Sequence, residues 1–291
     1  MPTVDVFISL VLALLMFSVG SSVKFKDFKH IFKDSKPLFF GLSLQIFLLP
    51  LIAFTICLMA PLDPLFKLGI MILSLSPGGA TSNFISYLLD LKTALSLSLT
   101  FINSLVILIT IPLGVSFFSQ YFLGETSTLK LDWIATIKDI SLLILIPVFI
   151  GITFRQMWSS LYEKSKTIVK YGSTFLLGLV FVIKYFASEE KGGSGLTITE
   201  TLNILPYILL VHLLSMFLSY FLARINKIEQ FESLTISIEL GLQNTTLALL
   251  VSSVYLANNQ VSKPALVYAM FSFFTTFIFG YITKRTTLKT D

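Results

Sequence analysis

The sequence predicts an all-α polytopic membrane protein, and three observations support this fold class. Hydrophobic residues make up 55% of the 291-residue chain and charged residues only 13%, about half of the share that a soluble domain usually carries. The charged residues cluster between apolar runs of about 20 residues, the length that a helix needs to cross a bilayer. Within these runs the apolar residues are continuous rather than alternating, which argues against membrane-spanning strands.

Nine runs satisfy this length requirement. The first follows a short segment that carries Asp5 but no Lys or Arg, and the positive charges come after it. We therefore interpret it as a retained helix, because a cleaved signal peptide has the opposite polarity. In chain order, the predicted spans cover 4–22, 37–60, 64–89, 93–119, 133–155, 166–187, 201–224, 231–256 and 263–283.

The distribution of Lys and Arg predicts how these spans are oriented. The formal net charge is +5, from 21 basic and 16 acidic residues. If the N-terminus is outside, 15 of the 21 basic residues fall in inner segments and 6 fall outside. The positive-inside rule therefore places the N-terminus outside and the C-terminus inside a plasma (inner) membrane. The lipid bilayer is then the expected environment, and no basic stripe with interleaved aromatic residues indicates a nucleic-acid partner.

The other chemical signals in the chain are weak. Cys57 is the single cysteine, so it allows no intramolecular disulfide and no multi-cysteine metal site. Gly193-Ser194-Gly195 resembles a serine-hydrolase turn, but no recognisable base accompanies it. His212 lies within the seventh span and is interpreted as a hydrogen-bonded structural histidine, with a proton relay as the alternative. We therefore expect a protein that is not an enzyme.

Two predicted spans are interrupted by residues that disfavour a continuous helix. The third contains Pro77, which removes an amide donor, followed by Gly78 and Gly79, which relax the backbone. The eighth contains Gly241 among polar residues. Unwound backbone at membrane depth is tolerated where it lines an enclosed cavity or binds an ion. A simple proline kink would also account for Pro77 alone.

Glu239, in the eighth span, is the acidic residue that lies nearest the middle of a predicted span. A carboxylate at this depth costs several kcal/mol unless it is neutralised, and no Lys or Arg is expected at comparable depth. Gln243 and Asn244 follow it and offer amide oxygens, which are ligands that hard cations accept. A single carboxylate suits a monovalent ion, so sodium is the first candidate and a proton is the alternative.

Polar side chains in two other spans could complete such a site. Ser96, Thr100 and Asn103 are spaced so that they share one face of the fourth predicted helix. Gln45 is isolated in the apolar second span. Any of these could instead join neighbouring helices, because small polar side chains often do so in membranes.

The two interrupted spans occupy corresponding positions in the two halves of the chain, which is typical of transporters with an inverted repeat. We place the first repeat half in 1–121 and the second in 133–291, within a single transporter unit that covers 1–291. The third span would run from outside to inside, and the eighth would run in the opposite direction. Their half-helix ends would then meet at mid-membrane and provide amide groups for an anion and carbonyl groups for cations.

The segments 76–83 (SPGGATSN) and 239–244 (ELGLQN) resemble motifs of the bile acid:sodium symporter family, and the likeness spans nearly the whole chain. The uneven halves are similar to those of nine-helix bacterial members. The resemblance implies a core domain, in which two broken helices cross at mid-membrane, and a smaller panel domain. Predicted spans 2, 3, 4, 7, 8 and 9 would form the core, and spans 1, 5 and 6 would form the panel.

The resemblance also implies two co-transported sodium ions and the residues that bind them. The first ion would be held by Ser82, Asn83, Ser96, Thr100 and Glu239. The second would be held by the side chains of Gln45, Glu239 and Gln243 and by the backbone carbonyls of Leu240 and Leu242.

Substrate would lie beside the crossover, near Thr81, Asn244 and the last helix. There the chain has Thr275 and Thr276, where some bacterial relatives carry a His-Asn pair, so the substrate stays open. The implied function is a sodium-coupled symporter that imports an organic anion, bile-acid-like or a small carboxylate, by alternating access. The alternatives are a proton-coupled carrier that uses Glu239, and a channel or non-transporting membrane protein. No protein partner is implied.

Overall fold

The computed structural model describes residues 3–22, 35–76, 78–124, 133–187 and 192–287, and these ranges fold almost entirely into helices. Within them, seven helical segments are long and apolar enough to cross a membrane, and β-pairing is limited to one isolated bridge. The described part of the chain therefore has the all-α, multi-pass character that the composition predicts.

The seven segments correspond to the first, second, fourth to seventh and ninth predicted spans. α9 begins at Ser159, seven residues before the predicted start of the sixth span at 166. Its first turns carry charged residues, so they form helix without belonging to the apolar run from which the span was predicted. The segments are α1 (Thr3–Ser22), the combined α3–η1–α4 segment (Lys36–Met59), α7 (Thr93–Leu123), α8 (Trp133–Met157), α9 (Ser159–Phe186), α10 (Ile198–Ile225) and α13 (Asn259–Thr287).

The third and eighth predicted spans are both interrupted, as expected. The third consists of α5 (Pro64–Leu75) and α6 (Ala80–Leu88), and Pro77 between them lies outside the described residues. The eighth consists of α11 (Gln230–Gly241) followed by α12 (Thr245–Leu249), which continues into the π-helical segment η3 (Leu250–Tyr255). Each interrupted span therefore brings helix ends and unpaired backbone groups to the interior of the molecule.

The second span changes its hydrogen-bond pattern in the middle. α3 (Lys36–Ser43) and α4 (Leu49–Met59) are joined by the π-helical segment η1 (Leu44–Leu48), in which the Leu49 amide donates to the Leu44 carbonyl. Pro50 has no amide hydrogen and cannot continue the α pattern, so a wider turn precedes it. This wider turn carries Gln45.

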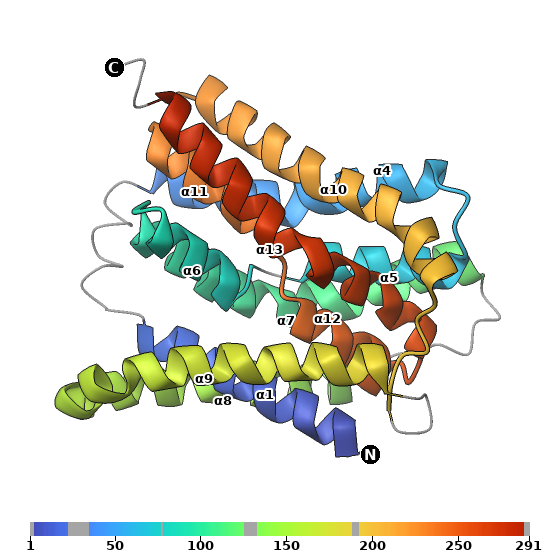
Figure 1. Ribbon diagram of the computed structural model, residues 1–291, viewed down its shortest axis with the longest axis horizontal. Helices are drawn as coiled ribbons and strands as arrows, with labels where there is room; N and C mark the ends of the chain where they lie inside the picture. The colour runs from blue at the N-terminus through green and yellow to red at the C-terminus, as the bar shows by residue number, and fades with distance from the viewer. Residues whose placement is uncertain (1–2, 23–34, 77, 125–132, 188–191, 288–291) are drawn as a thin grey trace.

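The helices are arranged in two layers that Figure 1 shows one above the other. α1 packs along α8 and α9 in one layer, which contains the predicted spans 1, 5 and 6. In the other layer α10 packs against α11, α13 and α4, while α5 packs against α7 and α13. The interrupted spans belong to this second layer, which is therefore the layer that positions the site.

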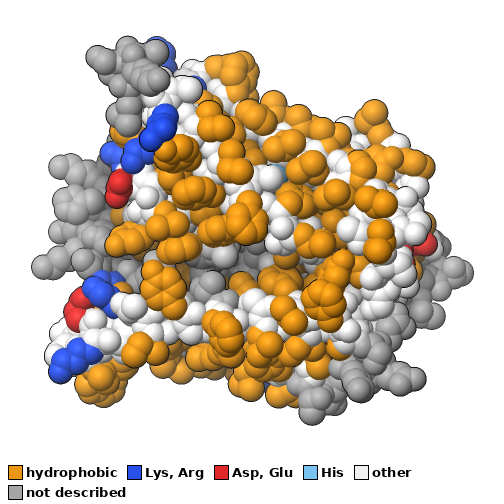
Figure 2. Space-filling view, in the orientation of Figure 1, with side chains coloured by type: hydrophobic (Ala, Val, Ile, Leu, Met, Phe, Trp, Pro, Cys, Tyr) orange, Lys and Arg blue, Asp and Glu red, His pale blue; other side chains and the backbone are white. Residues whose placement is uncertain are grey.

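Contacts between helix ends show that several predicted inner residues gather at one end of the molecule. The Lys36 ammonium donates to the Asn226 carbonyl at 2.5 Å, and Lys284 donates to the Leu89 carbonyl at 2.6 Å. Lys92 pairs with Glu229 at 2.9 Å. Figure 2 shows Lys and Arg side chains near the end where the C-terminus lies, and hydrophobic side chains over most of the rest of this face.

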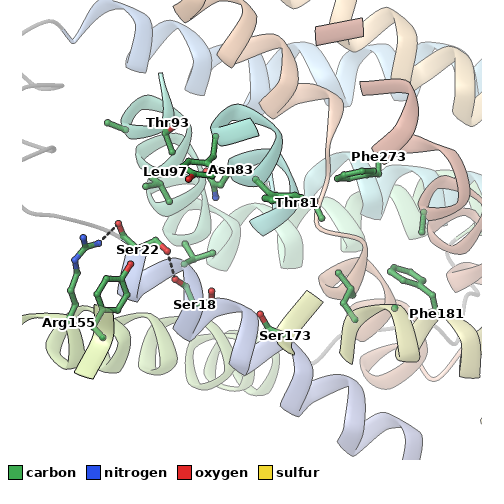
Figure 3. A pocket seen from close by; sticks show the side chains of 18 residues that line it. Ser18, Ser22, Thr81, Asn83, Thr93, Leu97, Arg155, Ser173, Phe181 and Phe273 are labelled. Atoms are coloured by element: carbon green, nitrogen blue, oxygen red, sulfur yellow. Dashed lines mark hydrogen bonds between the residues drawn. The ribbon is translucent and has the colours of Figure 1, made fainter. Parts of the chain in front are cut away.

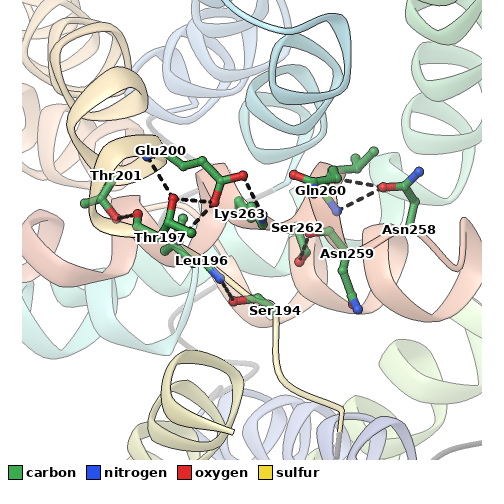
Figure 4. Close-up of polar contacts among 11 residues, drawn as sticks. Ser194, Leu196, Thr197, Glu200, Thr201, Asn258, Asn259, Gln260, Ser262 and Lys263 are labelled. Atoms are coloured by element: carbon green, nitrogen blue, oxygen red, sulfur yellow. Dashed lines mark hydrogen bonds and ion pairs between the residues drawn. The ribbon is translucent and has the colours of Figure 1, made fainter. Parts of the chain in front are cut away.

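Two basic residues at the opposite end are buried rather than exposed. The Lys263 side chain is 2% exposed and pairs at 2.7 Å with Glu200, which also closes a capping box with Thr197 at the start of α10 (Figure 4). The Lys184 side chain, likewise 2% exposed, lies 3.9 Å from Asp5. Ser194 is fully buried at this end and donates its amide to the Lys184 carbonyl, so it is no exposed nucleophile.

We predict that replacing Glu200→Gln lowers stability by about 3 kcal/mol, because it leaves the buried Lys263 ammonium without a counter-charge. The measurement is thermal unfolding in detergent at constant sodium concentration. The matched control is Glu163→Gln, which breaks an exposed pair with Lys166 and should leave the unfolding temperature unchanged. Adding Lys263→Gln to Glu200→Gln should recover much of the loss. Equal effects of the two single variants would contradict this account.

Candidate ion-binding site

The backbones of the two interruptions touch each other. Gly78, between α5 and α6, forms an antiparallel bridge with Gln243, between α11 and α12. A Cβ atom built on Gly78 would overlap the Glu239 carboxylate. Only glycine therefore lets the first interruption approach this side chain so closely.

Gly241 lies at the end of α11, where the predicted unwinding begins, and it also lies close to α10. It is the last residue of α11, and a Cβ atom there would come within 2.7 Å of the Met216 sulfur on α10. The extended backbone follows at Leu242, and the Asn244 side chain then caps α12 by accepting the Leu247 amide at 3.0 Å. Gly241 thus permits close packing of α11 on α10, and the break follows directly after it over the next three residues.

Glu239 is fully buried in the last turn of α11. Ser96 on α7 donates to its Oε2 at 2.9 Å, and Thr100, one turn further along α7, donates to Oε1. The Ser82 hydroxyl on α6 lies near this carboxylate and donates to the Gly79 carbonyl at 2.7 Å. The i, i+4 spacing of Ser96 and Thr100 therefore places both hydroxyls on one carboxylate.

Asn83 on α6 joins the same cluster. Its Oδ1 lies 2.8 Å from the Ser96 hydroxyl, which it can accept from in place of Glu239, and its Nδ2 donates to Thr100 at 3.2 Å. The first predicted ligand set, namely Ser82, Asn83, Ser96, Thr100 and Glu239, thus lies together in the structure. The ion pairs found among the described residues involve other acidic residues, so no Lys or Arg neutralises Glu239 there.

The second predicted ligand set is brought together in part. The Gln243 side chain donates through Nε2 to the Leu240 carbonyl at 2.7 Å, while its Oε1 is buried without a hydrogen-bond partner among the described residues. Oε1 and Nε2 of Gln45 are likewise buried without a hydrogen-bond partner among the described residues. Gln45 lines a cavity of about 20 Å³ together with Ser76 and Asn103. The Leu242 carbonyl lies in the extended backbone beside Gln243.

A group of hydrogen bonds that the sequence does not reveal supports this interruption from α13 and α10. The Tyr268 hydroxyl donates to the Gly241 carbonyl and accepts from the Gln243 amide at 3.4 Å, so it spans the break. His212 lies 3.3 Å from the Tyr268 hydroxyl and 2.7 Å from that of Thr275. His212 therefore has the hydrogen-bonded environment expected of a structural histidine. His212 and Tyr268 are 56 residues apart in the sequence, so no local motif reveals that they interact.

A cavity of about 610 Å³ lies beside the carboxylate cluster, between α1, α8 and α9 on one side and α6, α7 and α13 on the other (Figure 3). Thr81 and Asn83 line it. Asn244 and Thr81 line a smaller cavity of about 80 Å³ that shares Phe273 and Phe181 with it.

The two threonines of the last helix lie elsewhere on α13. Thr275 is bonded to His212, and Thr276 is fully buried, with its hydroxyl 3.3 Å from the Cβ position of Gly241. The α13 residues that line the larger cavity are instead Ala269 and Phe273. Thr275 and Thr276 therefore remain sequence-based predictions as substrate ligands.

Comparison with known proteins yields one family. The sequence profile of the Sodium Bile acid symporter family matches residues 9–191. The ileal sodium/bile acid cotransporter of Oryctolagus cuniculus is 30% identical over 246 residues, which cover 82% of this chain and 67% of that protein. The probable chloroplastic sodium/metabolite cotransporter BASS1 of Arabidopsis thaliana is 25% identical over 88% of this chain and 61% of its own length.

A bacterial relative shows the same likeness. The uncharacterized sodium-dependent transporter YocS of Bacillus subtilis is 22% identical over 241 residues, which cover 83% of this chain and 72% of that protein. The chain thus spans about two thirds of the length of these curated relatives.

We predict opposite outcomes for alanine at the two adjacent glycines of the first interruption. Gly78→Ala should lower the unfolding temperature by several degrees, because its Cβ atom would displace the Glu239 side chain. Gly79→Ala should leave it within about 1 °C of the parent protein, because its Cβ atom would meet ordinary contacts at 3.6 and 3.7 Å. Thermal unfolding of both purified variants tests this, and equal destabilisation would contradict the close approach at Gly78.

Proposed function

The chain belongs to the Sodium Bile acid symporter family, and we propose that it imports an organic anion by alternating access, driven by two sodium ions. The family consists of secondary transporters rather than enzymes. The observation that carries the proposal is the fully buried Glu239 carboxylate, surrounded by hydroxyl and amide oxygens where two interrupted spans meet. Relatives named as sodium cotransporters support sodium as the coupling ion.

The proposed first ion site uses the cluster around Glu239. Hydroxyl groups and amide oxygens are neutral ligands, and one carboxylate supplies the single negative charge that a monovalent cation requires. Ser96 and Thr100 now direct their hydroxyl hydrogens at Glu239. On sodium binding these hydroxyls would rotate, so that their oxygen lone pairs face the ion.

The proposed second site uses groups whose hydrogen-bonding capacity is unused. A buried amide oxygen without a partner costs on the order of 1–3 kcal/mol, and Gln45 and Gln243 each present one among the described residues. A sodium ion bound by these oxygens, by Glu239 and by the carbonyls of Leu240 and Leu242 would satisfy both amide oxygens. Sharing Glu239 between the two sites would couple the binding of the two ions.

The energetics suit accumulation of an anion. Each sodium ion that enters releases about 2.3 kcal/mol per 100 mV of membrane potential and about 1.4 kcal/mol per tenfold concentration gradient. Two ions and a monoanion carry one net positive charge inward, so the membrane potential also drives the combined step.

The two layers supply the moving parts of the proposed mechanism. The layer of α1, α8 and α9 would act as the panel and would rock against the layer that contains the interrupted spans, which would act as the core. We place the end where Lys36, Lys92 and Lys284 gather on the cytoplasmic side of the plasma membrane, with the N-terminus outside. The cavity of about 610 Å³ between the layers would then hold the substrate beside Thr81.

The decisive variant is Glu239→Gln. Thermal stability of the parent protein should rise with sodium chloride but not with choline chloride, by about 2.7 kcal/mol at a 100-fold excess over the dissociation constant. Glu239→Gln should remove this sodium-specific stabilisation, because both proposed sites use its charge. Glu229→Gln, at a half-exposed carboxylate paired with Lys92, is the matched control and should respond as the parent does. Sodium stabilisation that persists in Glu239→Gln would refute the assignment.

Gln243→Ala should separate the two ion sites. It removes a ligand of the second site only, so sodium activation of uptake into proteoliposomes should shift to concentrations about tenfold higher while the protein stays folded. Uptake in choline chloride at fixed pH is measured in parallel. Transport that persists unchanged without sodium would favour a proton on Glu239 instead.

A further inference from the structure

The substrate cavity continues into a more polar compartment toward the end where the C-terminus lies. Ser18, Ser22, Tyr87 and Tyr162 line both the main cavity and an adjoining cavity of about 300 Å³. Beyond Thr81, the main cavity is lined by the aromatic side chains of Phe181 and Phe273 (Figure 3). The combined space therefore has an apolar interior and a polar mouth.

Arg155, near the end of α8, supplies a positive charge at this mouth. Its Nη1 donates to the carbonyls of Ser21 and Ser22 at 3.0 and 2.6 Å, and its guanidinium lies 4.5 Å from the centre of the Tyr162 ring. These contacts hold the side chain against the last turn of α1, and Arg155 is one of the residues that line the main cavity (Figure 3). The position of the charge is thus fixed by backbone carbonyls and an aromatic ring.

The charge on Arg155 has no acidic partner in the described part of the chain. The ion pairs found there do not include it, and no Asp or Glu is among the described residues that line the two cavities. Lys166, which lines the adjoining cavity, pairs with Glu163 at 2.5 Å. Both hydrogen bonds of Arg155 use Nη1, which leaves Nη2 to donate to a ligand.

We propose that Arg155 forms an anion-binding subsite at the cavity mouth, which recognises the carboxylate or sulfonate of an amphipathic substrate whose apolar body lies in the interior. The inference rests on the proposed transport function and adds a specificity-determining residue to it. A guanidinium that is partly withdrawn from water binds such an acid group strongly. The apolar side chains beyond Thr81, such as Phe181 and Phe273, favour a substrate with a bulky hydrocarbon body over a short polar acid.

The test measures binding of taurocholate, a steroid with a terminal sulfonate, and of cholamide, an uncharged steroid amide, to the full-length protein in sodium chloride. Arg155→Gln should weaken taurocholate binding at least about tenfold and change cholamide binding less than about twofold. Arg155→Lys, which keeps the charge, should recover part of the taurocholate affinity. The matched control is Arg285→Gln, because Arg285 also lies 4.5 Å from a tyrosine ring, that of Tyr281, and lines neither cavity.

Four results would overturn the subsite. They are unchanged taurocholate affinity in Arg155→Gln, an equal loss for cholamide, an equal loss in Arg285→Gln, and a parent protein that binds neither steroid. The measurements are repeated in nanodiscs with and without phosphatidylglycerol, because a lipid phosphate could occupy the same charge. An effect of Arg155→Gln that depends on the anionic lipid would assign Arg155 to lipid binding. Sodium stabilisation without steroid is recorded for each variant, and its retention shows that the ion sites are intact even if the subsite fails.

Discussion

The burial of one carboxylate between two interrupted spans is the constraint on which the rest of the structure depends. Glu239 lies where the backbones of the interruptions meet, so α6 and α7 must present hydroxyl and amide groups to it. Gly78 is required at the point of closest approach. The packing of α11 against α6 and α7 follows from the need to satisfy this one side chain in a medium without water.

The polar groups around Glu239 come from both halves of the chain. Asn83 and Ser96 precede the midpoint of the sequence, whereas Glu239 and Gln243 follow it. In the proposed mechanism a bound sodium ion would therefore join elements that are separate in sequence, and its binding would favour one relative position of these elements over others. Tyr268 on α13 contacts Gln243 in the second interruption and His212 on α10, so these two helices are also connected to the site.

Sequence reasoning predicted the features that depend on local chemistry. Proline and glycine in an apolar run indicated the first interruption, and an isolated acidic residue indicated the centre of the site. The contacts of Tyr268 with the break depend on helix packing over long sequence distances, so the apolar pattern does not reveal them. Likewise, the burial of Lys263 depends on its pairing with Glu200 on another helix, which no local pattern indicates. The placement of Thr275 against His212 also follows from the rotation of α13, which the nearly uniform apolar sequence does not specify.

The two buried lysines have a mechanical consequence. Lys184 and Asp5 belong to α9 and α1, whereas Lys263 and Glu200 belong to α13 and α10. Each pair thus joins two helices of the same layer, and neither pair crosses the boundary between the layers. If the layers rock as proposed, both ion pairs stay formed throughout the transport cycle. The deformation would then concentrate in the contacts between the layers, which α7 makes with α8 and α1 and which α12 makes with α1. None of the ion pairs found in the described part of the chain crosses this boundary, so these contacts can re-form without separating charges.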